Sequence, residues 1–101
     1  MSEDLVYTLG ELKSTLDPVF QAYGVRSAVL FGSYAKGCAD RSSDVDILVD
    51  SGLRGLRFFG LLESVSSALR VPVDLLDVTQ IEPDSRIDLE NQNSGVRIYG
   101  Q

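Results

Sequence analysis

The sequence predicts a small α/β domain of the α+β kind, in which helices flank a mixed sheet of three to four strands. Stretches with apolar residues every three or four positions, typical of helices, alternate with short apolar or alternating stretches, typical of strands. The length of 101 residues suffices to bury a core without disulfides, but not to build two domains. Residues 1–101 are therefore expected to form one domain.

The first helix is expected to begin at about Thr8 and to end at Gly24. Thr8 and Glu11 have the spacing of a capping box, and glycine is a typical C-terminal stop. Pro18 lies inside this stretch, and because it lacks an N–H we expect it to kink or restart the helix. The apolar face of the helix consists of Leu5, Leu9, Leu12, Leu16, Val19 and Phe20.

Two strands are expected next. The apolar run 28–31 predicts a buried strand that stops at Gly32 and Ser33. After a polar stretch, the period-two alternation of residues 44–50 predicts a second strand, which Ser51 and Gly52 close.

The remaining elements follow the same logic. A second helical stripe consists of Phe58, Leu61, Leu62, Val65 and Leu69. Residues 73–78 predict a third strand, and residues 96–99 a short last one. Between Pro83 and Gly95 we expect a short helix.

The composition excludes several kinds of protein. The sequence has no His and only one Cys, Cys38, which excludes imidazole bases, common zinc sites and an intrachain disulfide. A formal net charge of -6 argues against direct nucleic-acid binding. No apolar run approaches the length of a membrane span, and the acidic N-terminus lacks the basic start of a signal peptide, so we expect a cytoplasmic protein.

Asp44 and Asp46 are the first candidate site residues. Two positions apart on a strand, their carboxylates project from one face and repel each other unless a cation lies between them. Mg²⁺ is the natural partner because it prefers oxygen ligands. Alone, such a pair is more often a solvated surface pair.

Gly32 and Ser33 form the second candidate feature, directly after a buried strand. A glycine lets a backbone approach a ligand closely, and the following amides and the Ser33 hydroxyl can point at phosphate oxygens. Alone, this is an ordinary turn. If its strand neighbours the one that carries the two aspartates, phosphate and metal meet. Tyr34 is expected to pack rather than to stack on a base.

A third carboxylate should complete the site. Asp74 lies in an apolar strand, where a carboxylate is costly unless it is paired or bound to a metal. Asp77 points to the opposite face by parity. An ordinary surface position at the end of a strand remains the alternative for Asp74.

These residues together resemble the nucleotidyltransferase superfamily that includes DNA polymerase beta. The stretches "LFGSYAKG", "SDVDILVD" and "VPVDLLD" are similar to its smallest members, the minimal nucleotidyltransferases. The resemblance runs from Val29 to Asp77, with helices expected on either side, and implies the palm-like nucleotidyltransferase fold. The three-part motif is far more specific than any of its parts.

The resemblance also implies a mechanism. Two Mg²⁺ ions, or Mn²⁺ in their place, would bind a nucleoside triphosphate and activate an acceptor hydroxyl. Lys36 would contact phosphate, although a solvated surface lysine is an equal alternative. The implied site residues are Gly32, Ser33 and Lys36 for the nucleotide, and Asp44, Asp46 and Asp74 for catalysis and metal.

Minimal nucleotidyltransferases are often antitoxins, which transfer AMP from ATP to a tyrosine of a HEPN-domain ribonuclease toxin. The resemblance thus implies a protein adenylyltransferase with a HEPN-domain partner, in a homo- or hetero-oligomer. The negative net charge would suit a basic, RNA-cutting partner. Two alternatives stay open: a binding antitoxin or scaffold with a silent site, and nucleotidyl transfer to a small molecule.

Overall fold

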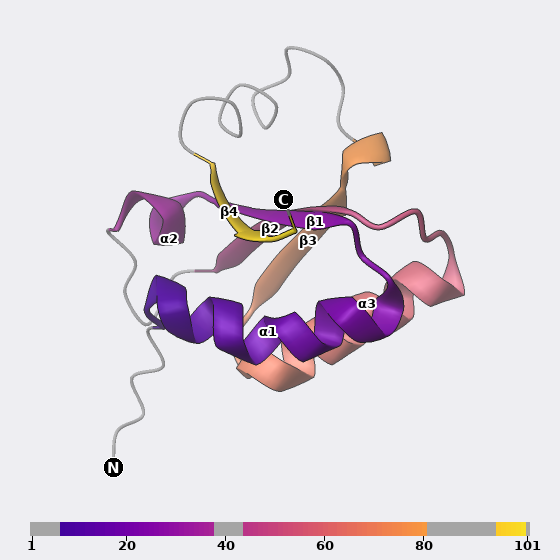
Figure 1. The fold of residues 1–101 in the computed structure, drawn as a ribbon, viewed down its shortest axis with the longest axis horizontal. Coiled ribbons are helices and arrows are strands. Elements are labelled where there is room, and N and C mark those ends of the chain that lie inside the picture. Colours follow the sequence, from indigo (N-terminus) through magenta and orange to yellow (C-terminus); the bar gives the residue numbers. More distant parts are fainter. Residues whose placement is uncertain (1–6, 38–43, 81–94, 101) are drawn as a thin grey trace.

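A computed structural model describes residues 7–37, 44–80 and 95–100 of the chain (Figure 1). The elements follow one another as α1 (Leu9–Tyr23), β1 (Ser27–Phe31), α2 (Ser33–Lys36), β2 (Val45–Asp50), α3 (Leu56–Leu69), β3 (Val73–Asp77), the 3₁₀ turn η1 (Val78–Gln80) and β4 (Val96–Tyr99).

The four strands form one mixed sheet in the order β3-β2-β1-β4. β1 pairs antiparallel with both β2 and β4, whereas β2 and β3 run parallel and are connected through α3. A parallel pair requires such a crossover, and a helix is its usual form. The expected fold class, a mixed sheet with flanking helices, is confirmed, and the two strands that carry the candidate motifs are neighbours.

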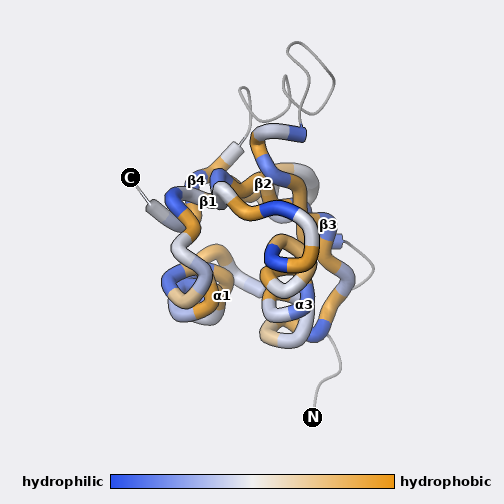
Figure 2. Tube along the Cα trace, turned by 90° about the vertical axis from the view of Figure 1, so that its right-hand side faces the viewer, coloured by the Kyte–Doolittle hydropathy of each residue, from blue (hydrophilic) through white to orange (hydrophobic). Residues whose placement is uncertain are grey.

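Helices α1 and α3 lie side by side on one face of the sheet (Figures 1 and 2). The core forms between these helices and the sheet, and Figure 2 shows apolar segments turned into that space. Strand side chains alternate between faces, so the aspartates that alternate with core residues point away from the helices. The fully buried core side chains are Leu12, Leu16, Phe20, Ala28, Leu30, Val45, Ile47, Val49, Leu61, Val65 and Leu69.

The ends of α1 agree with the sequence. The Glu11 amide donates to Thr8 Oγ1 at 3.1 Å, and the Thr8 amide donates to Glu11 Oε1 at 2.8 Å. Gly24 closes the helix in the left-handed conformation, at φ 69°. The expected restart at Pro18 is wrong, because α1 is one continuous helix. Leu16 and Phe20, on either side of Pro18, are fully buried, and their packing outweighs one missing hydrogen bond.

The second half also follows the expected pattern, with small differences. β3 ends one residue earlier than expected, because Val78 begins η1. The expected last strand is confirmed as β4, whereas the helix expected between Pro83 and Gly95 lies outside the described residues. Two short elements, α2 and η1, were not expected. Among the described residues, no helix is long and apolar enough to cross a membrane.

Candidate active site

Asp46 lies in β2, between two neighbouring strands. The register places it opposite Phe31 of β1 on one side and opposite Asp74 of β3 on the other. Paired strands lie about 4.8 Å apart, so the two aspartates are direct neighbours on one face. Asp46 is half-buried and Asp74 is exposed. Two of the expected carboxylates, 28 positions apart in the sequence, therefore lie side by side.

Asp44 directly precedes β2 and is exposed. Its spacing of two positions from Asp46 gives it the same parity. Within the described ranges, no three acidic, His or Cys side chains are close enough to form a ready-made metal cluster. Mg²⁺ does not need one, since it binds through one or two carboxylates and completes its shell with water and substrate phosphate. The oxygen donors of Asp46 and Asp74 thus fit a hard divalent cation.

Gly32 brings the turn after β1 against the Asp46 carboxylate. It follows Phe31, the register partner of Asp46, and takes the left-handed conformation at φ 75°. An ideal Cβ built on Gly32 would lie 3.3 Å from Asp46 Cγ and closer still to Oδ2. The turn expected to hold phosphate and a carboxylate expected to hold metal are therefore in contact.

Ser33 and Lys36 are the first and last residues of α2, so the structure places their backbone within one turn of Gly32. Tyr34, between them, is buried and belongs to the hydrophobic core. The interpretation that Tyr34 packs is thereby confirmed. Cys38 lies outside the described residues.

Asp77 is on the other face, as parity predicts, and is buried at the end of β3. Its Oδ1 accepts from the Ser51 amide at 3.0 Å and from the Ser51 hydroxyl at 2.7 Å. Its Oδ2 accepts from the Thr79 amide at 3.0 Å and from the Thr79 hydroxyl at 2.7 Å. Burial alone would raise the pKa of Asp77, but these four hydrogen bonds to the carboxylate outweigh it and lower the pKa.

Asp77 therefore has a structural function: it ties the end of β3 to the end of β2 and to η1. Ser51 and Thr79 had no expected function. The signal that could have found them is a small hydroxyl residue just past the end of each strand, within reach of a buried carboxylate.

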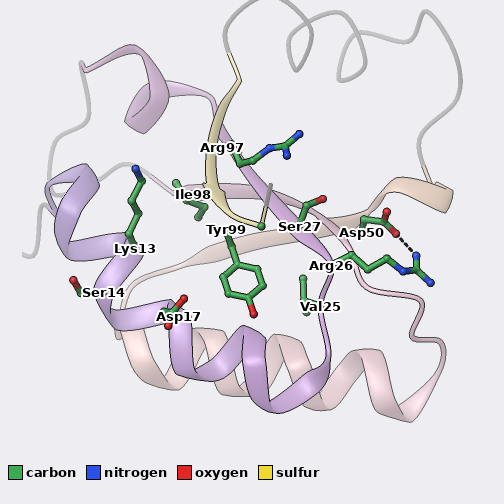
Figure 3. Close-up of a pocket in the computed structure, with 11 residues that line it drawn as sticks. Lys13, Ser14, Asp17, Val25, Arg26, Ser27, Asp50, Arg97, Ile98 and Tyr99 are labelled. Atoms are coloured by element: carbon green, nitrogen blue, oxygen red, sulfur yellow. Dashed lines mark hydrogen bonds and ion pairs between the residues drawn. The ribbon is translucent and has the colours of Figure 1, made fainter.

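A groove between α1 and β4 is a concave feature of the described chain (Figure 3). Lys13, Asp17 and Tyr99 are among its lining residues, and an ion pair of 2.7 Å between Arg26 and Asp50 lies at its side. Neither Asp46 nor any other expected site residue lines this groove. It is separate from the carboxylate site.

Comparison with known proteins agrees with this geometry. A profile of the nucleotidyltransferase domain family matches residues 12–93. The protein adenylyltransferase MntA of Thermococcus cleftensis is 40% identical over 77 residues, which cover 68% of this chain and 76% of the relative.

Solved structures have the same fold. A toxin–antitoxin structure with AMP-PNP contains a chain that superposes with a TM-score of 0.75 at 25% identity, covering 88% of this chain and 73% of its own. A chain from the complex of a tri-AMPylated Shewanella oneidensis HEPN toxin with an MNT antitoxin reaches a TM-score of 0.70 at 20% identity, covering 93% and 74% respectively. At that identity, the second likeness concerns the fold alone.

Proposed function

The chain belongs to the nucleotidyltransferase domain family, and on that premise we propose that it transfers AMP from ATP to a hydroxyl group of a protein. The observation that carries the proposal is the position of Asp46, beside Asp74 and against Gly32. At this point, carboxylates that can bind a divalent cation lie next to a turn that can bind phosphates. Transfer of a nucleotide from a triphosphate requires both. The name of the Thermococcus relative supports adenylyl transfer in particular.

Each expected site residue has a role in this proposal. Asp44 and Asp46 would hold two Mg²⁺ ions, or Mn²⁺, and Asp74 would complete the ion on the acceptor side and accept the acceptor's proton. When bound, these ions lower the pKa of the acceptor hydroxyl and neutralise the charge of the leaving pyrophosphate. The nucleotide would be held by Gly32, Ser33 and Lys36.

We further propose that the acceptor is a tyrosine of a HEPN-domain partner and that the chain acts as its antitoxin. The similarity to a toxin–antitoxin structure with a bound ATP analogue supports this pairing. The net charge of -6 suits a basic partner, because opposite charges accelerate and orient association.

The test uses the full chain, the protein encoded by the neighbouring gene, Mg²⁺ and ATP labelled on the α-phosphate. Label on a tyrosine of the partner, absent with Asp46→Asn, would support the proposal. A stable complex without label would instead indicate a binding antitoxin. Label on a small hydroxyl compound, with none on the partner, would indicate a small-molecule transferase.

A further inference from the structure

Gly32 occupies a position that no other residue could fill without a change in the site. Its φ of 75° lies in the left-handed region, which residues with a side chain rarely adopt. The three atoms nearest to an added Cβ all belong to Asp46, and Oδ2 would lie below the 3.0 Å limit that real Cβ contacts respect. An alanine here therefore strains the backbone and also collides with one particular carboxylate.

Such a collision would displace the Asp46 carboxylate, because the backbone of Asp46 is held in place by the sheet. β2 is an inner strand of the sheet, and Asp46 is held in register by Phe31 on one side and Asp74 on the other. The Asp46 side chain would have to turn or move until Oδ2 and the added Cβ are at least 3.0 Å apart. Mg²⁺ requires ligand distances of about 2.0–2.1 Å, and functional groups must be held within about 0.5 Å of the productive geometry.

We propose that Gly32 is a positioning residue for Asp46: its missing side chain leaves the space in which the Asp46 carboxylate lies. This inference rests on the proposed function for its catalytic meaning, but the steric relation does not depend on that function. The competing explanation is that Gly32 acts only through its own backbone contact with phosphate. In that case the identity of residue 32 would not influence Asp46.

Gly37 provides a matched control within the same chain. Its φ of 76° is nearly that of Gly32, so alanine meets left-handed backbone strain at either position. Among the described residues, no atom lies within 4 Å of an added Cβ at Gly37. The difference between Gly32→Ala and Gly37→Ala therefore reports the collision with Asp46, and a second comparison in an Asp46→Ala background isolates it.

The first experiment is a double-mutant cycle in thermal stability, without metal or nucleotide. Gly37→Ala should lower the Tm by about 4–8 °C, whether residue 46 is Asp or Ala. Gly32→Ala should lower the Tm further in the wild-type background. With Asp46→Ala its effect should shrink to that of Gly37→Ala. Equal effects of Gly32→Ala in both backgrounds would overturn the proposal.

The second experiment measures binding of a non-hydrolysable ATP analogue with Mn²⁺ and with a chelator, together with single-turnover transfer. Compared with Gly37→Ala, Gly32→Ala should lose the metal-dependent part of its affinity for the ATP analogue. Its single-turnover rate of transfer should be about 100-fold lower. Its affinity in chelator should equal that of Gly37→Ala. A selective loss of affinity in chelator would favour the phosphate explanation and overturn ours. No metal-dependent binding by the wild type would refute the proposed function, whereas the stability cycle would still decide the steric claim.

Discussion

Asp46 and Asp74 are neighbouring carboxylates, and their charges repel each other when no cation is bound. Two unit charges 4 Å apart repel by about 1 kcal/mol in water and about 4 kcal/mol at the effective dielectric near a protein surface. Asp74 is exposed, so the lower figure is the relevant one. In the proposed function, a cation bound by both carboxylates would offset this repulsion.

Replacing Asp46 by Asn should abolish transfer and leave the free energy of unfolding unchanged or slightly higher. Asn removes one charge of a repelling pair and also removes a carboxylate ligand. Asp44→Asn should behave in the same way. Urea unfolding in chelator measures the free energy of unfolding, and an assay with Mg²⁺ measures transfer. Near wild-type transfer by either variant would refute the metal assignment.

Asp74 and Asp77 should respond to alanine in opposite ways. Asp74→Ala should reduce the single-turnover rate by orders of magnitude with little change in ATP affinity, since Asp74 serves the acceptor side in the proposed function. Asp77→Ala should leave the rate of the folded protein nearly unchanged and lower stability by about 2–3 kcal/mol, because it leaves four donors unpaired. A silent Asp74→Ala beside an inactive but folded Asp77→Ala would contradict this assignment.

At the level of the element, the C-terminal end of α3 contains a strained residue. Arg70 has φ 61°, a left-handed conformation in which glycine is preferred. Arg70→Gly should raise stability by about 0.5–1 kcal/mol in urea unfolding, whereas Arg70→Ala should not. Gly24 is the matched position at the end of α1, with φ 69° and no atom of the described residues within 4 Å of an added Cβ. Gly24→Ala should therefore lower stability by about 1 kcal/mol.

The elements also indicate what the sequence can predict. Local signals were sufficient for both ends of α1, because a capping box and a C-terminal glycine act within one turn. Parity within a strand separated Asp74 from Asp77, because alternation needs no knowledge of the neighbouring strands. α2 and η1 are single turns, too short to show a period. The restart expected at Pro18 was wrong, because the continuity of α1 depends on its packing against α3 and the sheet.

The contacts between elements could not be predicted in the same way. The approach of Gly32 to Asp46 requires that β1 pair with β2 in one particular register, and the bonds of Asp77 to Ser51 require β3 beside β2. Gly32, Asp46 and Asp77 stood out in the sequence, whereas the function of Ser51 and all of these distances depend on tertiary pairing.

For the molecule as a whole, ATP with Mg²⁺ should raise the Tm, and ATP with a chelator should raise it much less. A ligand that binds only the native state stabilises it by RT ln(1 + [L]/Kd), which is about 2.7 kcal/mol at 100 times Kd. Differential scanning fluorimetry of the free chain measures both shifts. Equal shifts would show that phosphate binding does not depend on the carboxylates.

Acid should destabilise the wild type partly through Asp77. Its folded-state pKa lies below the ordinary value of 3.8, so its contribution is complete above that value and is lost as the pH falls through the lowered pKa. As the pH falls from about 5 through the lowered pKa, the free energy of unfolding should therefore fall more steeply in the wild type than in Asp77→Asn. Parallel curves would contradict the lowered pKa.

β3, which carries Asp74, is an edge strand of the described sheet, with only β2 beside it. Edge strands detach at lower free energy than the interior of a sheet, in local openings that amide hydrogen exchange detects. Each opening of β3 would separate Asp74 from Asp46 and relieve their repulsion, which lowers the free energy of opening in the free chain. A cation bound by both carboxylates would raise the free energy of opening and slow hydrogen exchange of the β3 amides. Protection of the β3 amides from exchange would thus report whether a cation is bound at the site, without any substrate or turnover.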